Sequence, residues 1–140
     1  MTAQEKILYR ILDANYNRCK EALRVVEDLL RFSNAKRVLV SSLKQSRHEL
    51  TQIFLKAPRS FKEILRCRDV KKDSTKAIAI QDRSKKIKVE DLLYANFQRS
   101  EEALRVLEEC MKPLRPSLAA ELSCLRFKIY DLEKRTSQQF

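Results

Sequence analysis

The chain contains no glycine among its 140 residues, and this absence limits the fold more than any other feature. Glycine provides the positive φ angles and close backbone approach that GxxxxGK[ST] and GxGxxG phosphate loops need, so neither loop can be present. The Asn-Gly and Asp-Gly turns of β-hairpins are missing for the same reason. The composition is instead rich in Leu, Glu, Lys, Arg and Ala, which are strong helix formers. We therefore predict an all-α protein.

The length and the net charge of the chain further limit the class of protein and of its partners. A chain of this size forms one domain and buries a core without disulfides or a structural metal. The net charge of +11 favours phosphate-bearing partners. The first ten residues carry charges where a secretory signal needs an apolar run, and no apolar segment approaches the ~20 residues of a membrane span. We expect a cytoplasmic protein that does not enter membranes.

The cysteines do not have the spacing of a metal site. Cys19, Cys67, Cys110 and Cys124 form no CxxC pair, and His48 is the single histidine. In a reducing compartment these residues are free thiols, some of them packed in the core.

Apolar periodicity and capping signals predict five helices. Thr2 and Glu5 have capping-box spacing, and Ser60 and Glu63 repeat it before a short helix with Phe61, Ile64 and Leu65 inward. The long helices are expected over residues 2–31, 35–56, 88–112 and 117–135, the last with Ser117 as its N-cap.

A basic connector is expected over residues 57–87. Between Lys56 and Lys88 there are 12 Lys/Arg and four Asp/Glu, which is +8 in 33 residues. Residues 69–86 show no durable period apart from the short run Ala77–Ile80. Such a segment is either a solvated linker or a functional loop that orders on an anionic ligand.

An internal repeat is the strongest signal in the sequence. Ala14-Asn15-x-x-Arg18-x-x-Glu21-Ala22-Leu23-Arg24-Val25-x-Glu27 recurs 81 residues later, with the same residue types, from Ala95 to Glu108. The following helices also align, with Leu43, Arg47, Leu50 and Ile53 matching Leu122, Arg126, Ile129 and Leu132. We predict two pseudo-symmetric helical hairpins in a single domain, with repeat 1 at about 2–56 and repeat 2 at about 88–136, that form a four-helix core.

Polar residues of the repeat fall on the apolar stripes of the predicted helices. At about 100° per residue, Asn15 and Asn96 lie within a stripe and Arg18 and Arg99 inside its edge. Arg47 and Arg126 lie on the apolar stripes of the partner helices. We expect Glu21 and Glu102 to orient Arg18 and Arg99 by ion pairing. The second repeated pairs, Arg24 with Glu27 and Arg105 with Glu108, point away from the stripe and are expected to be surface pairs.

These inward groups support two interpretations. Unpaired buried charges cost several kcal/mol, so the groups must meet acids, carbonyls, water or a ligand. The amides could fix helix register and the arginines could pin the helices through glutamates. Alternatively, the donors converge as a binding site for phosphate or carboxylate, a role that guanidinium groups suit.

Three runs resemble a known family. They are Ile11–Asp28 followed by Arg47-His48-Glu49-Leu50, the block Ala95–Glu109, and the ending Leu125-Arg126-x-x-x-Tyr130-x-Leu132-Glu133-Lys134. They resemble the helical domain that precedes the synthase barrel in fused thiamine-phosphate synthases of cyanobacteria and some other bacteria. Related stand-alone proteins form an alternative family of hydroxymethylpyrimidine-phosphate kinases. The resemblance covers nearly the whole chain.

The resemblance implies phosphorylation of hydroxymethylpyrimidine phosphate with ATP and Mg²⁺. Arg18, Arg47, Arg99 and Arg126 would then supply cations, and Asn15 and Asn96 would read the pyrimidine edge or a phosphate. Asp69 and Asp73 would act as catalytic base or metal contacts. In the family the connector reads Arg-Asp-x-x-x-Asp-x-Gly-Thr, whereas here Arg68 to Thr75 lacks the glycine and is one residue shorter.

Other functions stay open. The missing glycine favours a non-catalytic module that senses the same ligand or docks in trans onto a separate thiamine-phosphate synthase. Charge alone suggests nucleic-acid binding, which no recognised motif supports. The internal two-fold plan is compatible with a homodimer.

Overall fold

The computed structural model describes residues 1–75 and 87–139. These residues form five helices and no strand: α1 Ala3–Phe32, α2 Arg37–Leu55, α3 Phe61–Leu65, α4 Val89–Met111 and α5 Pro116–Ser137. The predicted all-α class is therefore confirmed. None of these helices combines the length and apolar character that crossing a membrane requires.

The helix ends follow local side-chain chemistry. Thr2 and Glu5 form the expected capping box at α1, and Ser60 and Glu63 form one at α3. The chain leaves α1 through Asn34, whose φ of 59° is a left-handed conformation that asparagine tolerates in the absence of glycine. The prediction of Ser117 as an N-cap is wrong, because Arg115 takes that place and Pro116 begins α5. Proline suits the first helical position since its missing N–H has no helical partner there.

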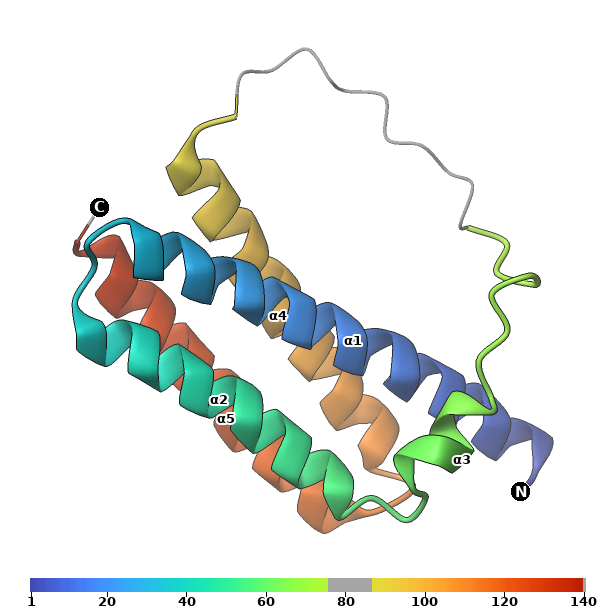
Figure 1. Ribbon diagram of the computed structural model, residues 1–140. Helices are drawn as coiled ribbons and strands as arrows, with labels where there is room; N and C mark the ends of the chain where they lie inside the picture. The colour runs from blue at the N-terminus through green and yellow to red at the C-terminus, as the bar shows by residue number, and fades with distance from the viewer. Residues whose placement is uncertain (76–86, 140) are drawn as a thin grey trace.

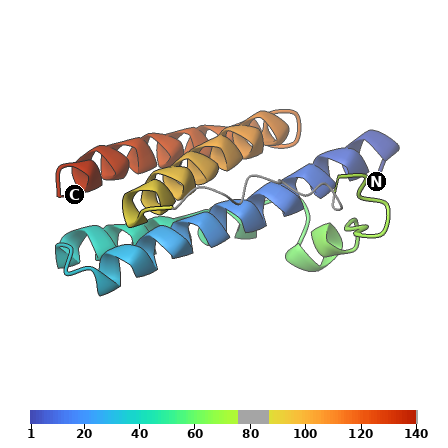
Figure 2. The same ribbon diagram turned by 90° about the horizontal axis from the view of Figure 1, so that it is seen from above.

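The four long helices form two hairpins that pack face to face (Figures 1 and 2). Helices α1 and α2 form one hairpin and α4 and α5 the other, and their contacts cross between α1 and α4 and between α2 and α5. Helices α1 and α4 run antiparallel. This arrangement places the two copies of the repeated block beside each other.

A continuous apolar core joins all four long helices and α3. It includes Leu12, Leu23, Leu43, Leu104 and Leu122, each completely buried. In α3, Ile64 is buried as expected and Phe61 is partly buried, but Leu65 is exposed, so its predicted inward orientation is wrong. Five residues give only little more than one helical turn, so α3 cannot direct all three apolar side chains to one side.

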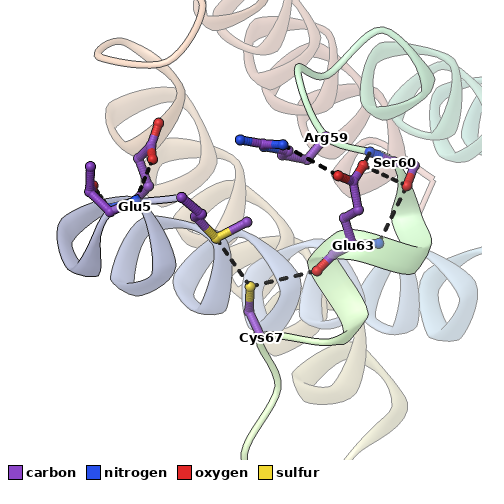
Figure 3. Close-up of polar contacts among 7 residues, drawn as sticks. Glu5, Arg59, Ser60, Glu63 and Cys67 are labelled. Carbon is purple, nitrogen blue, oxygen red and sulfur yellow. Dashed lines mark hydrogen bonds and ion pairs between the residues drawn. The ribbon is translucent and has the colours of Figure 1, made fainter.

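The segment that follows α2 packs against the beginning of α1 (Figure 3). The Cys67 thiol lies 3.7 Å from the Met1 sulfur and donates to the Glu63 carbonyl, and Arg59 pairs with the Glu63 carboxylate. Tyr16 of α1 packs between Phe54 and Phe61, with ring centroids 4.5 and 5.3 Å away. The predicted apolar run Ala77–Ile80 lies outside the described residues.

Candidate anion-binding cleft

A cleft of about 660 Å³ lies between α1 and α4. Each repeat contributes five lining residues, and the two sets occupy matching positions of the repeated block. The pairs are Asn15 and Asn96, Arg18 and Arg99, Glu21 and Glu102, Ala22 and Ala103, and Val25 and Val106. The alanines remove side-chain bulk from the floor, so the longer polar groups surround an open space.

Because α1 and α4 run antiparallel (Figure 1), the matching residues of the two repeats form two similar halves of this cleft. The N-terminal part of the α1 block, with Asn15 and Arg18, faces the C-terminal part of the α4 block. In the other half, Asn96 and Arg99 face the C-terminal part of the α1 block. Each half therefore contains one amide and one guanidinium from one repeat.

The two asparagines are held in the same way. Asn15 Nδ2 donates to the Ile11 carbonyl at 3.0 Å, and Asn96 Nδ2 donates to the Leu92 carbonyl at 2.9 Å. Both residues are 6% exposed. Because each NH₂ group bonds to its own helix, the amide oxygen is left to accept a hydrogen bond from another group. In Asn96 this oxygen accepts a long contact of 3.5 Å from Arg99 Nη1.

The two cleft arginines are not held in ion pairs in the described part of the chain. Arg18 and Arg99 are exposed, and within residues 1–75 and 87–139 neither forms an ion pair with a carboxylate. The expected pairing with Glu21 and Glu102 is therefore wrong. Residues three apart lie close on a helix, but these side chains extend over an open cleft where water competes for them.

Arg47 and Arg126, which were also expected to bind the ligand, do not line the cleft. Arg47 Nε donates to Glu27 Oε2 at 3.0 Å, and Arg126 Nε and Nη2 donate to Glu108 Oε2 at 3.1 and 3.0 Å. The Arg126 Nη1 group also donates to the Tyr130 hydroxyl, and hydrogen bonds to Tyr130 and Glu108 raise the pKa of the guanidinium. The two arginine–glutamate ion pairs connect α1 with α2 and α4 with α5.

The same pairs correct the expectation that Glu27 and Glu108 are surface residues. Both are buried, with exposures of 5% and 8%. A signal for this was present in the sequence, because both glutamates are identical members of the repeated block and both inward arginines recur in the following helices. A buried arginine needs a buried acid, and each repeat provided one at a matching position.

The proposed catalytic carboxylates do not line the cleft. Asp69 Oδ1 accepts from the Lys72 amide at 3.1 Å, and Asp73 Oδ1 accepts from the Thr75 amide and hydroxyl, both at 3.1 Å. These hydrogen bonds from Thr75 lower the pKa of Asp73, and the charges of Arg10 and Arg18 add to the effect. Asp73 therefore lies on the side of the cleft that holds Arg18.

A tie between the connector and α1 was not anticipated from the sequence. Arg68 donates Nε and Nη2 to the two oxygens of Asp13 at 2.6 and 2.7 Å. Arg10 Nη2 also reaches the Asp69 carbonyl at 3.5 Å. These contacts hold residues 68 and 69 against α1 one turn before Asn15. No spacing rule links residues 55 positions apart, so the sequence offered no local signal for them.

In the described residues, no three His, Cys, Asp or Glu side chains gather where they could hold a metal ion. All four cysteines are free thiols, as predicted, and Cys19 is buried in the core, where burial raises its pKa to about 12.

Comparisons with known proteins agree with the repeat. The chain is 35% identical over 129 residues to a thiamine-phosphate synthase of Nostoc punctiforme, covering 92% of this chain and 35% of that protein. It is 38% identical over 131 residues to the thiamine-phosphate synthase of Synechocystis sp., covering 94% of this chain and 36% of that protein. The chain thus spans about one third of the length of these relatives.

No solved structure matches the chain significantly. The sequence pattern of the ThiD2 family matches residues 10–135, which include both copies of the repeated block and the connector between the hairpins. The chain therefore belongs to the ThiD2 family.

Proposed function

We propose that the cleft binds hydroxymethylpyrimidine phosphate and that the protein transfers a phosphoryl group to it within thiamine biosynthesis. The observation that carries this proposal is the pair of guanidinium groups, Arg18 and Arg99, which lie at matching positions of one cleft and form no ion pair within the described residues. The similarity to thiamine-phosphate synthases supports a role in thiamine biosynthesis, and the family resemblance supports phosphoryl transfer as the reaction.

The two halves of the cleft suit two phosphate-bearing molecules. Phosphoryl transfer depends mainly on positioning and on neutralising charge, so each phosphate needs a nearby cation. Arg18 and Arg99 each provide a planar donor fork for phosphate oxygens. The oxygen atoms of Asn15 and Asn96 can accept a hydrogen bond from an amino group on a pyrimidine or purine ring. Glu21 and Glu102 also line the cleft and offset part of the positive charge, which favours a neutral ring beside the phosphate.

Magnesium fits this site only as part of a nucleotide complex. Mg²⁺ keeps several waters and commonly binds through one or two carboxylates together with substrate phosphates. Asp73, on the side of Arg18, is the carboxylate that would contact such an ion, and Asp69 lies in the same turn. The bound metal would neutralise the transferred phosphoryl group.

One observation favours a second candidate, binding without turnover. The carboxylates of Asp69 and Asp73 accept hydrogen bonds from residues of their own turn, and neither residue lines the cleft. A protein that binds the ligand without transferring phosphate would act as a sensor, or would dock on a separate thiamine-phosphate synthase.

Thermal unfolding with hydroxymethylpyrimidine phosphate tests the cleft directly. We expect the ligand to raise the melting temperature, and we expect Arg18→Ala and Arg99→Ala to reduce that rise. Arg24→Ala is the matched control, because Arg24 is an exposed arginine of the same helix that pairs with Glu27 and Asp28 outside the cleft. A rise that all three variants retain would place the ligand elsewhere.

A turnover assay with MgATP separates the two candidates. Transfer that Asp73→Asn abolishes, while the melting shift with the pyrimidine phosphate persists, supports the kinase. A melting shift without any phosphate transfer by the unaltered protein supports the sensor. Absence of both shift and transfer contradicts both.

A further inference from the structure

The two halves of the cleft have matching linings, but the charges at their outer ends differ. We call them the Arg18 half and the Arg99 half, after the arginine that each contains. Arg10 precedes Arg18 by eight residues on α1, and Asp91 precedes Arg99 by eight residues on α4, so the two occupy corresponding positions of the repeats. A cation therefore stands before the Arg18 half at the position where a carboxylate stands before the Arg99 half.

The beginning of the connector is held against α1 at the end where the Arg18 half lies. Arg68 donates to both carboxylate oxygens of Asp13, at 2.6 and 2.7 Å, and Arg10 Nη2 donates to the Asp69 carbonyl at 3.5 Å. In the second repeat Tyr94 occupies the position of Asp13. A tyrosine cannot form the same ion pair, so the sequence of the second repeat does not provide this attachment.

The Arg18 half therefore combines cations with a carboxylate. The charges of Arg10 and Arg18 both help to lower the pKa of Asp73, so this carboxylate lies near both guanidinium groups. A nucleoside triphosphate has more phosphate oxygens and more negative charge than a monophosphate, and it carries Mg²⁺. The ion commonly takes one or two protein carboxylates as ligands in addition to phosphate oxygens. Cations beside an available carboxylate thus suit a triphosphate with its metal.

The Arg99 half continues into an apolar groove of about 470 Å³ at the end of α1. Val25 lines both the cleft and this groove, which makes the two spaces continuous. The other apolar walls are Leu29, Phe32 and Val89. The Phe32 side chain is 78% exposed, so its ring is available for stacking, and Asp28 provides a hydrogen-bond acceptor in the same groove. These walls suit a neutral heteroaromatic ring that bears a methyl and an amino group.

We propose that the two halves bind different ligands: the Arg18 half binds the triphosphate of a nucleotide, and the Arg99 half binds the pyrimidine phosphate with its ring in the apolar groove. This assignment rests on the function proposed for the cleft and adds to it which ligand each half takes. The reverse assignment would place the triphosphate next to Asp91 and the apolar groove, away from Asp73 and Arg10. The difference between the two ends of the cleft therefore favours one orientation.

The assignment brings the two reacting phosphates together in the shared cleft. An oxygen of the pyrimidine phosphate attacks the γ-phosphorus of the nucleotide and forms the new P–O bond. The bond from the γ-phosphorus to the β–γ bridging oxygen breaks, and the nucleoside diphosphate leaves with that electron pair. Arg99 then neutralises the attacking phosphate, and Arg18 neutralises the leaving one.

Isothermal titration with MgATP and with hydroxymethylpyrimidine phosphate, each alone and at equal ionic strength, tests the assignment. Arg10→Ala should weaken MgATP binding by about three- to tenfold and leave binding of the pyrimidine phosphate unchanged. Asp13→Asn breaks the ion pair with Arg68 and should also weaken MgATP binding alone. Phe32→Ala should do the opposite, with a loss of about three- to tenfold for the pyrimidine phosphate and none for MgATP.

Two matched controls remove a charge and an aromatic ring elsewhere. Lys44→Ala removes an exposed cation of α2, and Phe127→Ala removes an exposed ring of α5, and neither residue lines the cleft or the groove. Both variants should bind the two ligands as the unaltered protein does.

The outcomes separate this assignment from the function on which it rests. If the unaltered protein binds both ligands but Arg10→Ala and Phe32→Ala weaken both equally, weaken the opposite ligand or weaken neither, the assignment is overturned and the proposed function stands. If the unaltered protein binds neither ligand, the proposed function is overturned together with the assignment. Binding of the pyrimidine phosphate without MgATP would overturn the assignment and support the sensor.

Discussion

The two hairpins have matching residues in the cleft that they share and in the ion pair that joins their helices, but different residues on their outer sides. Both carry an arginine paired with a buried glutamate between their helices, and both contribute the same five residues to the cleft. They differ on the outer sides. The first hairpin places Tyr16, Lys20 and Thr51 at its helix junction and is packed by α3 and the connector. The second places Glu101 beside Tyr130 at its junction, and α3 makes no extensive contact with it.

This difference separates two kinds of constraint on a duplicated chain. A cleft on the axis between two copies uses both copies of each residue, so a change in one copy removes half of the site. A helix junction away from the axis affects only its own hairpin, so the two copies can diverge. Glu101 lies outside the cleft, so its raised pKa can be a property of the second hairpin alone.

The largest expected effect comes from the buried ion pairs. Arg126→Ala should lower the free energy of unfolding by about 3 kcal/mol, because it leaves Glu108 buried without its partner. Arg47→Ala should cost less, since Glu27 retains a second contact with Arg24 at 3.7 Å. Urea denaturation of the two variants measures the difference. An equal cost in both hairpins would contradict the asymmetry inferred from Arg24.

The cleft arginines allow a second comparison of the two halves, which rests on the function proposed for the cleft. Arg99→Ala should weaken binding of hydroxymethylpyrimidine phosphate by about ten- to a hundredfold, the usual loss for a charge-assisted hydrogen bond. Arg18→Ala should weaken it less, because Arg10 leaves positive charge near that half. Isothermal titration measures both constants. Greater loss in Arg18→Ala would mean that the connector side is the principal phosphate site.

The junction of the second hairpin should make stability depend on pH. Because the pKa of Glu101 is raised to about 8 from its ordinary 4.5, the folded protein binds more protons than the unfolded chain between these values. Stability should therefore fall as pH rises, by about 2 kcal/mol from pH 6 to pH 8, and change little above that. The pKa values of Glu5 and Glu63 are lowered, so these groups act only under more acidic conditions.

Urea denaturation across this range measures the dependence. Glu101→Gln should be nearly independent of pH over the same interval, while Glu109→Gln should retain the slope. A flat profile for the unaltered protein would mean that Glu101 is not kept protonated by its surroundings.

Much of the fold followed from the sequence because the signals for it are local or repeated. The capping boxes at Thr2 and Ser60 and the two identical blocks predicted the helices and the two-hairpin plan, and the structure brings Asn15, Arg18 and their counterparts into one cleft. Helical periodicity also placed the asparagines on the inner side correctly, since that property depends only on residue spacing.

The failures concern contacts between helices. A wheel shows on which side of its own helix a residue lies, but it does not show the position of the neighbouring helix. Glu27 and Glu108 therefore read as surface residues, although the partner helices cover them. The Asp13–Arg68 tie was missed because the two residues are distant in sequence and lie outside the repeated block. Side-chain partners across an interface depend on packing, which no single-helix pattern contains.

The smallest effect compares the starts of α1 and α4. Thr2 accepts from the Glu5 amide at 3.1 Å, while Glu5 accepts from the Thr2 amide at 2.7 Å. At α4, Lys88 stands in the corresponding place, and its amide donates to Asp91 at 3.0 Å. Thr2→Ala should cost about 1 kcal/mol, the usual loss for an N-cap. Lys88→Thr should stabilise the protein by about 0.5 kcal/mol, because threonine can accept from an otherwise free helix N–H whereas an ammonium cannot. Melting curves of both variants measure these changes, and a loss of stability in Lys88→Thr would show that the lysine makes a contribution that its replacement cannot supply.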